Sequence, residues 1–567
     1  MKKCIAIILA AVLLLSALCA CASDTVPTQS AQTGTEETAT NDETAALPTP
    51  TPEPAGELTV KYAGDGTPVR TTDNYRVFYE IFVGSFSDSN GDGIGDLRGI
   101  INRMDYLNDG DPTSGKSLGI EGIWLTPIFS SPSYHKYDVT NYYSVDSSFG
   151  TTEDLKELVD LCHTRGVKVI LDLPINHTGS LNKWYGEFVR AHREGDVDNP
   201  AYERYSYYSA PDKAPAGRTF SQITGTSDYV ECNFAGNMPE LNFDSEEVYT
   251  LVYDVAKYYL DMGVDGFRFD AAKYVYFGDN AKSAAFWERY ISDLKKINED
   301  LYTVAEVWDG DGITDRYFPY LNCFNFTTAG TSGLIAESAK EGNVNVFTKY
   351  VQSYITKITS LREDAMYVPF IANHDTDRAA GYLPGLNGRA QMAANLYILC
   401  PGSPFIYYGE EIGLRGSRGG APTDADRRLA MIWGDGDTIK DPEGSIYNKA
   451  NKNADPVAEQ IADETSLYTY YKTLIAIRQA HPEIARGKYT ALSLPKKTGA
   501  FLSTYNGSTV CVIHNTSTDA VTIDMKSVTD VAFTKISAEI GIGDFETVTS
   551  FDGTTLVIPP QTSVILR

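Results

Sequence analysis

Residues 151–173 read TTEDLKELVDLCHTRGVKVILDL, and this stretch decides the fold because a helical pattern passes directly into a strand pattern. Thr151 and Asp154 have the spacing of a helix-capping pair. The apolar residues that follow recur at the three- and four-residue intervals of one helix face, and they are Leu155, Leu158, Val159 and Cys162. Gly166 ends the helix, and the branched residues after it are typical of a strand. The stretch therefore predicts a helix leading into a strand of a parallel sheet.

The same alternation of strand and helix recurs on both sides of this stretch. Short β-like runs lie at 77–83, 122–125, 167–173, 266–269, 302–305, 367–371 and 405–408, with a weaker candidate at 321–326. Seven strands and one candidate over about 400 residues predict an α/β fold of the (β/α)8 TIM-barrel type. A doubly wound parallel sheet is the alternative.

Three segments depart from the barrel pattern. Residues 178–243 are polar and rich in tyrosine, which predicts a subdomain inserted after the third strand. Residues 487–567 hold short alternating strands and predict a C-terminal antiparallel β-sandwich. Residues 21–57 are rich in Ser, Thr and Pro and predict an extended linker. The barrel and its insert are then expected at 58–486.

The first 20 residues have the pattern of a bacterial signal peptide. Lys2 and Lys3 precede an apolar run at 5–17 that is too short for a comfortable membrane span. The run ends in Leu-Cys-Ala-Cys, which resembles a lipobox and predicts that Cys21 is lipidated. We therefore expect a protein held at the extracellular face of a bacterial membrane. Ordinary cleavage that leaves a secreted protein is the alternative.

Composition excludes one class of partner. The formal net charge is −27, with 75 acidic and 48 basic residues, and it would repel nucleic acid. The later cysteines have no close spacing and predict neither a disulfide framework nor a zinc site, but buried apolar residues: Cys162, Cys232, Cys323, Cys400 and Cys511.

Carboxylates stand where four of the expected strands end. Asp172 closes the third strand, Asp270 follows the fourth, Glu306 the fifth and Asp375 the seventh. Residues at the carboxyl ends of barrel strands meet at one face of the barrel, so we expect these groups to converge. Converging carboxylates shift each other's pKa, as acid/base chemistry requires.

Two of these carboxylates suit the two roles in glycoside hydrolysis. Arg268 lies two residues before Asp270 on the same strand face, so we expect its charge to lower the pKa of Asp270 and to favour a nucleophile. Glu306 is flanked by Ala305, Val307 and Trp308, and this apolar setting predicts a raised pKa and a proton donor. Taken singly, a strand that ends in Arg-Phe-Asp is more often a structural ion pair.

Taken in order, these segments resemble the α-amylase family, glycoside hydrolase family 13. Its four principal regions are matched at 172–177, 266–274, 303–308 and 371–378, and further matches lie at 137–138, 238–242 and 402–413. The resemblance implies that Asp375 is the third catalytic carboxylate and that the reaction retains anomeric configuration through a covalent glycosyl-enzyme. The substrate-binding residues that it implies are Tyr137, Asp138, His177, Arg268, Lys273, His374 and Arg378.

The resemblance also bears on specificity. Lys273 is similar to the lysine of the α-amylase branch, which favours endo-hydrolysis of α-1,4 bonds in starch, amylose and maltooligosaccharides. Residues 238–242 and 88–96 resemble members between the oligo-1,6-glucosidase and neopullulanase groups. The alternatives are therefore a neopullulanase, an α-glucosidase or a transglycosylase, and, in a different class, a starch-binding protein without catalysis.

A candidate calcium loop lies at 88–96. Its oxygen-bearing residues stand at alternate positions, with glycines that allow tight winding: Asp88, Asn90, Asp92 and Asp96. The resemblance adds the carbonyl of Ile94 as a ligand and implies a structural Ca2+. A metal-free turn is the alternative. Tyr274 stands where the family usually has a histidine, so a second calcium site between barrel and insert is not predicted.

Overall fold

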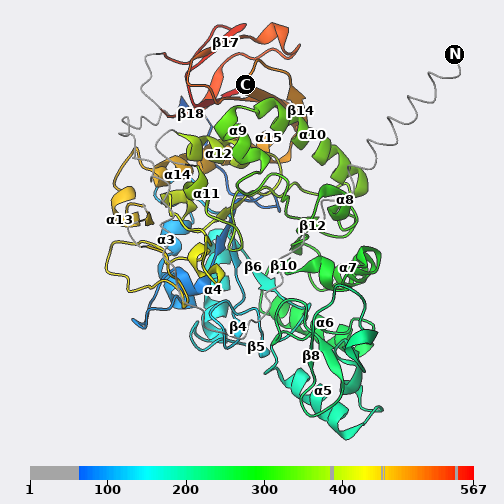
Figure 1. Ribbon diagram of the computed structural model, residues 1–567. Coiled ribbons are helices and arrows are strands. Elements are labelled where there is room, and N and C mark those ends of the chain that lie inside the picture. Colours follow the sequence, from blue (N-terminus) through cyan, green and yellow to red (C-terminus); the bar gives the residue numbers. More distant parts are fainter. Residues whose placement is uncertain (1–62, 65, 384–387, 449–450, 453, 543–546) are drawn as a thin grey trace, which may run out of the picture. The chain divides into compact units, whose positions relative to one another are not determined.

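A seven-stranded parallel sheet forms the centre of the barrel region (Figure 1). The computed structural model of the protein describes residues 63–64, 66–383, 388–448, 451–452, 454–542 and 547–567. The strands, in their order across the sheet, are β12 (Asn322–Cys323), β11 (Tyr302–Ala305), β10 (Gly266–Phe269), β6 (Lys168–Leu173), β3 (Gly122–Leu125), β2 (Phe78–Ile81) and β13 (Phe405–Tyr407). Every neighbouring pair runs parallel.

The eighth position of the barrel is taken by residues 367–371, which do not form the regular strand that was predicted. Val368 forms a bridge with Phe324, beside β12. On the other side, the Phe405 N–H of β13 donates to the Pro369 carbonyl at 2.9 Å. Proline has no N–H for a ladder, which explains the irregular pairing. The segment closes the ring between β12 and β13, so the predicted (β/α)8 barrel is confirmed.

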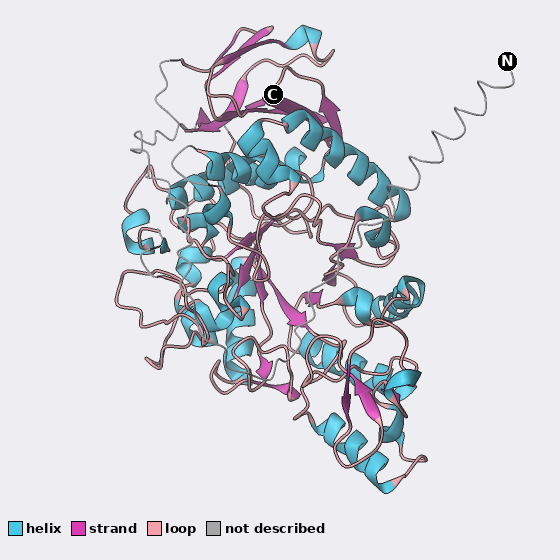
Figure 2. Ribbon diagram, in the orientation of Figure 1, coloured by secondary structure: helices cyan, strands magenta, loops and turns pink. Residues whose placement is uncertain are grey.

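Helices surround the sheet (Figure 2). Residues 151–166 form the predicted helix: Thr151 and Asp154 make a capping box at the start of α4 (Thr152–Arg165), and Gly166 ends it at φ 77°. The other described α-helices outside the inserted segment are α2 (Leu97–Asn102), α3 (Met104–Leu107), α6 (Glu246–Asp261), α7 (Asn280–Lys295), α8 (Asp311–Thr314), α9 (Leu334–Glu341), α10 (Val344–Leu361), α11 (Ala379–Tyr382), α12 (Arg389–Ile398), α13 (Val457–Gln460), α14 (Leu467–Ala480) and α15 (Pro482–Arg486).

The inserted segment follows β6 as predicted. It contains α5 (Lys183–Glu194) and a small antiparallel sheet in the order β7 (Tyr207–Tyr208), β9 (Tyr229–Glu231) and β8 (Phe220–Gln222). A separate hairpin of β4 (Phe129–Ser130) and β5 (Asn141–Val145) precedes α4.

The C-terminal part forms two antiparallel sheets around a separate apolar core. One sheet has the order β1 (Ala63–Gly64), β18 (Ile536–Gly541), β21 (Thr562–Leu566), β16 (Ser508–Asn515), β15 (Thr498–Tyr505) and β14 (Lys488–Leu492). The other contains β17 (Val521–Asp524), β20 (Thr555–Ile558) and β19 (Ser550–Phe551). The first described strand, β1, pairs with β18. Residues 63–64 therefore belong to this sheet and not to the barrel, where the sequence analysis had placed them.

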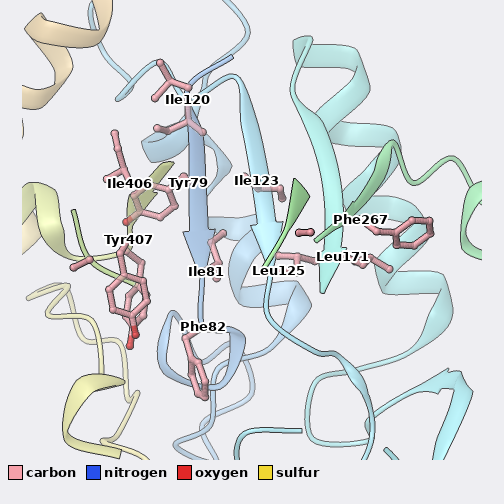
Figure 3. Packing of buried hydrophobic residues seen from close by; sticks show 14 of the residues in the cluster. Tyr79, Ile81, Phe82, Ile120, Ile123, Leu125, Leu171, Phe267, Ile406 and Tyr407 are labelled. Atoms are coloured by element: carbon pink, nitrogen blue, oxygen red, sulfur yellow. The ribbon is translucent and has the colours of Figure 1, made fainter. Parts of the chain in front are cut away.

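The two faces of the barrel strands pack against different cores. Outward residues such as Tyr79, Ile81, Ile123 and Leu125 join the cluster between sheet and helices (Figure 3). The inward residues form a second apolar cluster that includes Phe78, Trp124, Ile170, Val304 and Phe405. Side chains two residues further along a strand share the same face. Polar groups replace the apolar ones one such step higher, at Glu80, Asp172 and Glu306, so the apolar interior supports a polar layer at the carboxyl ends of the strands.

Two predictions about the rest of the chain have different outcomes. The five later cysteines are buried and free, as predicted. The signal peptide, the linker and the lipidation of Cys21 fall outside the described residues and stay predictions. Within the described ranges, every helix is too short or too polar to cross a membrane.

We expect Gly266→Ala to destabilise the barrel. A Cβ atom at Gly266 would lie 1.9 Å from the Tyr302 carbonyl oxygen, so β10 and β11 would have to separate. Overpacking of this kind costs about 1–3 kcal/mol of the free energy of unfolding. Thermal unfolding followed by circular dichroism measures the effect. Gly312→Ala is the matched control, because nothing lies within 4 Å of a Cβ atom there. Equal melting temperatures of the two variants would contradict the close approach of the strands.

Candidate active site

The guanidinium of Arg268 lies at the centre of the polar layer. Arg268 is 1% exposed, and its Nη1 donates to Asp172 at 2.8 Å and to Asp270 at 2.7 Å. Its Nη2 donates to Glu306 Oε2 at 3.0 Å. One planar group thus binds the end of β6, the residue after β10 and the residue after β11. These three carboxylates therefore converge, as predicted.

Backbone geometry fixes Glu306 further. Ala271, which follows Asp270, has φ 48°, a left-handed conformation that is uncommon for a residue with a side chain. In this conformation the Ala271 N–H donates to Glu306 Oε2 at 3.0 Å. Strained backbone of this kind is often found at functional sites.

A second network surrounds His374. Its Nδ1 lies 2.6 Å from Glu80 Oε1, and its Nε2 lies 2.7 Å from the Tyr137 hydroxyl and 3.0 Å from Asp375 Oδ2. The Tyr137 hydroxyl donates to Asp172 at 2.9 Å, and this bond joins the two networks. The Tyr137 ring stacks against the His374 imidazole at 5.7 Å.

The two candidate reacting carboxyls have raised pKa values. Burial raises the pKa of Glu306 to about 7, and the charges of Asp270 and Asp375 add to the rise while Arg268 opposes it. This direction agrees with the prediction. Burial also raises the pKa of Asp270, to about 6, although Arg268 lowers it. The predicted lowering is therefore wrong, because burial and the neighbouring carboxylates outweigh the single arginine.

The groups around His374 and Asp375 form a second pole of the site, and there the pKa of the carboxyl is lowered and not raised. Burial alone would lower the pKa of His374, but Asp375 and Glu80 raise it to about 10. Burial would raise the pKa of Asp375, but His374 and Arg428 hold it well below its usual range. His374 is therefore a cation and Asp375 an anion at neutral pH.

Sequence reasoning missed two residues of this pole. Arg428 Nη2 donates to Asp375 at 2.8 Å, and Arg428 Nε donates to the His374 carbonyl at 3.0 Å. Glu80 binds His374 from β2. Glu80 and Arg428 are both far in sequence from residues 373–375, so no local spacing connects them to His374 and Asp375. The inward position of Glu80, two residues after Phe78, is a signal that could have found it.

The other predicted sugar-binding residues lie at different depths. His177 is buried, its Nε2 lies 3.2 Å from the Tyr137 carbonyl, and burial lowers its pKa to about 4, so it is neutral. Asp138 is buried behind Tyr137 and accepts hydrogen bonds from Ser131 and Ser133. Asp138 therefore holds the loop that carries Tyr137.

Lys273 and Trp308 extend the site past the carboxylates. Lys273 Nζ donates to the Trp308 carbonyl at 2.7 Å and to Asp309 at 3.1 Å. The Trp308 ring is stacked on Phe326 at 4.8 Å, and Trp308 is 47% exposed. An exposed aromatic face two residues after Glu306 is available to cover the apolar face of a sugar ring.

Arg378 lies elsewhere. Its side chain is buried, Nη1 donates to the Tyr408 carbonyl at 2.6 Å and Nε donates to the Arg427 carbonyl at 3.0 Å. The guanidinium also packs over the Tyr407 ring. This position indicates a structural role beside β13 in place of the substrate contact that was predicted, and Arg428 is the arginine beside Asp375.

The candidate calcium loop is wound by its own side chains. Asp88 accepts hydrogen bonds from the N–H of Gly91 and Gly93, both at 2.7 Å. Asp92 accepts from Ile94 N–H at 2.7 Å, and Asp96 caps α2. The donor set fits Ca2+ in type, but the ion would have to share Asp88 and Asp96 with these bonds. No group of three or more His, Cys, Asp or Glu among the described residues is arranged to hold a metal, and Ca2+ stays a prediction.

An acid pair around one arginine at the carboxyl end of a (β/α)8 barrel is typical of a glycoside hydrolase. The family description "Alpha amylase, catalytic domain" matches residues 80–487. The chain therefore belongs to the α-amylase family, glycoside hydrolase family 13. Members of this family are enzymes that hydrolyse or transfer α-glucosyl units.

Three relatives show how close the likeness is. Alpha-amylase 3 of Dictyoglomus thermophilum is 33% identical over 443 residues, which cover 77% of this chain and 84% of that protein. A 4-alpha-glucanotransferase of Thermotoga maritima is 33% identical over 355 residues, which cover 60% of this chain and 72% of that protein. The solved structure of Eubacterium rectale Amy13B has a TM-score of 0.79 at 31% identity, with 89% of this chain and 97% of that chain covered. The chain is therefore an enzyme that acts on α-glucans. Its predicted position between the oligo-1,6-glucosidase and neopullulanase groups of the family stays a prediction.

We expect Glu80→Gln to lower both the pKa of His374 and the stability of the fold. The pKa of His374 is about 10 in the folded state and about 6.5 in the unfolded state. Protonated His374 therefore stabilises the fold fully at pH values below about 6.5. The contribution is lost as pH rises through about 10. The variant should therefore be less stable by about 2 kcal/mol near neutral pH, and the deficit should narrow toward pH 10.

Urea unfolding of both proteins over this pH range measures the difference. Glu157→Gln is the control, because Glu157 is exposed and pairs with Arg98 at the surface, where such pairs contribute little. A deficit that is constant with pH would show that Glu80 does not act through the charge of His374.

Proposed function

We propose that the protein is a retaining endo-hydrolase of α-1,4-glucosidic bonds in starch and related α-glucans. The observation that carries this proposal is the pair of carboxyls that share the Arg268 guanidinium, Asp270 at 2.7 Å and Glu306 at 3.0 Å. A retaining glycosidase needs a nucleophile and a proton donor about 5–5.5 Å apart. Two groups bound to neighbouring nitrogens of one guanidinium suit that separation.

The chemistry proceeds in two displacements. The Asp270 carboxylate attacks the anomeric carbon while the bond to the leaving oxygen breaks, and Glu306 gives its proton to that oxygen. A glycosyl ester with Asp270 results. Glu306, now ionised, takes a proton from water, the water oxygen attacks the anomeric carbon, and Asp270 leaves as a carboxylate. A pKa of about 7 lets Glu306 be proton donor in one step and base in the next.

The second pole would bind the reacting sugar. Asp375 is held as an anion by His374 at one carboxylate oxygen and by Arg428 at the other, and each oxygen can accept a further hydrogen bond from a sugar hydroxyl. Since its pKa is well below the usual range, it keeps its charge while positive charge develops at the anomeric carbon. His177 and Tyr137 would contact the same sugar.

Features on the leaving-group side support cleavage within a chain. Trp308 follows Glu306 by two residues and Lys273 Nζ donates to its carbonyl, so an exposed ring face and an ammonium group would be available to sugars past the bond cleaved. The same features suit a sugar acceptor that replaces water. Transglycosylation is therefore the second candidate, and the identity of 33% to a 4-alpha-glucanotransferase favours it.

We expect early mixed maltooligosaccharides from amylose, with pullulan uncleaved. Anion-exchange chromatography of the products separates the alternatives. Panose or glucose as the dominant early product would assign a neopullulanase or an exo-glucosidase, and products longer than a maltooligosaccharide substrate would assign a transferase. Asp270→Asn is the control: it should abolish hydrolysis and leave the circular dichroism spectrum unchanged.

We expect a bell-shaped dependence of kcat/KM on pH. Activity should fall below about 6, where Asp270 takes up a proton, and above about 7, where Glu306 loses the proton it must donate. With a glucosyl fluoride, whose leaving group needs no proton, Glu306→Gln should keep measurable kcat/KM and lose the alkaline limb. An alkaline limb that persists in this variant would assign it to a different group.

A further inference from the structure

Arg218 joins the inserted subdomain to the barrel. On the insert side its Nη1 forms an ion pair with Glu231, the last residue of β9. On the barrel side its Nη2 donates to the Phe277 carbonyl at 2.6 Å, and its guanidinium lies 4.4 Å from the centre of the Phe277 ring. Phe277 belongs to the loop after β10, which also carries Asp270. One side chain thus binds the insert to the loop of the candidate nucleophile.

The carboxylate that receives Arg218 is fully engaged. Glu231 is 2% exposed and also accepts hydrogen bonds from the Tyr208 hydroxyl at 2.9 Å and from Asn233 Nδ2 at 2.6 Å. The Asn233 N–H in turn donates to Glu240 at 3.2 Å, and the backbone N–H of Glu240 donates to the Glu231 carbonyl at 2.9 Å. The position of Glu231 therefore sets the position of the segment around Glu240.

That segment pairs with the end of the third barrel strand. His177 and Glu240 form an antiparallel bridge. The Leu241 N–H donates to the Asn176 carbonyl at 3.0 Å, and the Asn176 side chain binds the Glu240 carboxyl. A polar route thus runs from Arg218 through two glutamates to the backbone that presents His177.

An aromatic route joins the same two ends. Phe234 lies 5.3 Å from the His177 ring, Tyr274 lies 5.3 Å from Phe234, and Phe277 lies 5.3 Å from Tyr274. Arg218 covers the last ring of this series. Because both routes end at Arg218, its loss would loosen the support of His177 from two directions.

We propose that Arg218 is a positioning residue for the active site and acts through His177. A residue of this kind touches no substrate but fixes the geometry of one that does, and small misplacements of such a group are costly to catalysis. This role of Arg218 rests on the proposed function in one respect, namely that His177 contacts the reacting sugar. The contacts that carry it are independent of the bond that the enzyme cleaves.

The first test is a double-mutant cycle. Arg218→Met should lower kcat/KM for maltopentaose about tenfold, whereas in a His177→Asn background the same change should lower it less than about twofold, because the pair acts as one unit. Equal losses in the two backgrounds, or no loss in either, would overturn the proposal.

Folding needs a separate safeguard. Arg218→Met alone leaves the buried Glu231 carboxylate without its cation, and this can unfold the insert. The companion variant Arg218→Met/Glu231→Gln removes both charges and keeps the acceptor of Tyr208. It should show the same loss of kcat/KM with a melting temperature near that of the wild type.

Arg204→Met is the matched control. Arg204 also joins the insert to the barrel, through ion pairs with Glu187 of α5 and Glu247 of α6, and its side chain is similarly buried. These two ion pairs lead to α5 and α6, and not to the series of rings that joins Phe277 to His177. This variant should lower the melting temperature and leave kcat/KM within about twofold of the wild type.

A second readout does not depend on activity. Hydrogen exchange of the amides of Thr178 and Leu241, measured by mass spectrometry, reports the pairing between barrel strand and insert. Arg218→Met should speed exchange in peptides that cover 176–178 and 238–242, and Arg204→Met should not. Unchanged exchange in Arg218→Met would overturn the proposal even if the enzyme were to cleave a different α-glucan.

Discussion

The burial of one arginine organises the site. Arg268 is 1% exposed, inside a barrel whose lower interior is apolar. A charge in that position is costly unless anions surround it. The Arg268 guanidinium binds Asp172, Asp270 and Glu306. The carboxyl ends of β6, β10 and β11 are therefore held together, because their carboxylates neutralise the buried positive charge. The same charge keeps carboxylates together that would otherwise repel one another.

Two opposite charge arrangements meet at the Tyr137 hydroxyl. Around Arg268 the carboxyls outnumber the cation, and burial raises the pKa of both Asp270 and Glu306. Around Asp375 the cations His374 and Arg428 hold the pKa of the carboxyl low. One pole can therefore exchange protons near neutral pH while the other keeps a fixed negative charge. A reaction that moves a proton and develops positive charge needs both.

Sequence alone predicted the layer of strand-end groups but not its energetics. Asp270 and Glu306 could be found because each directly follows a short β-like run, and a barrel brings such positions to one face. The pKa of Asp270 was predicted in the wrong direction, because the sequence shows the neighbour Arg268 and not the burial that outweighs it. Glu80 and Arg428 were missed because their contacts with His374 and Asp375 connect distant parts of the chain. Residues 367–371 were predicted as a strand from composition, although Pro369 prevents regular pairing.

The pairing of β1 with β18 links the two extremes of the described chain. β1 is an edge strand of the C-terminal sheet, and only β18 separates it from β21, the last strand. The beginning and the end of the fold are therefore neighbours in one sheet, although the whole barrel lies between them in sequence. Deleting the C-terminal domain to obtain a minimal barrel would also remove the anchor of the entering chain. Conversely, joining these neighbouring ends and opening the chain in a surface loop would give a circular permutant that keeps every strand of both sheets.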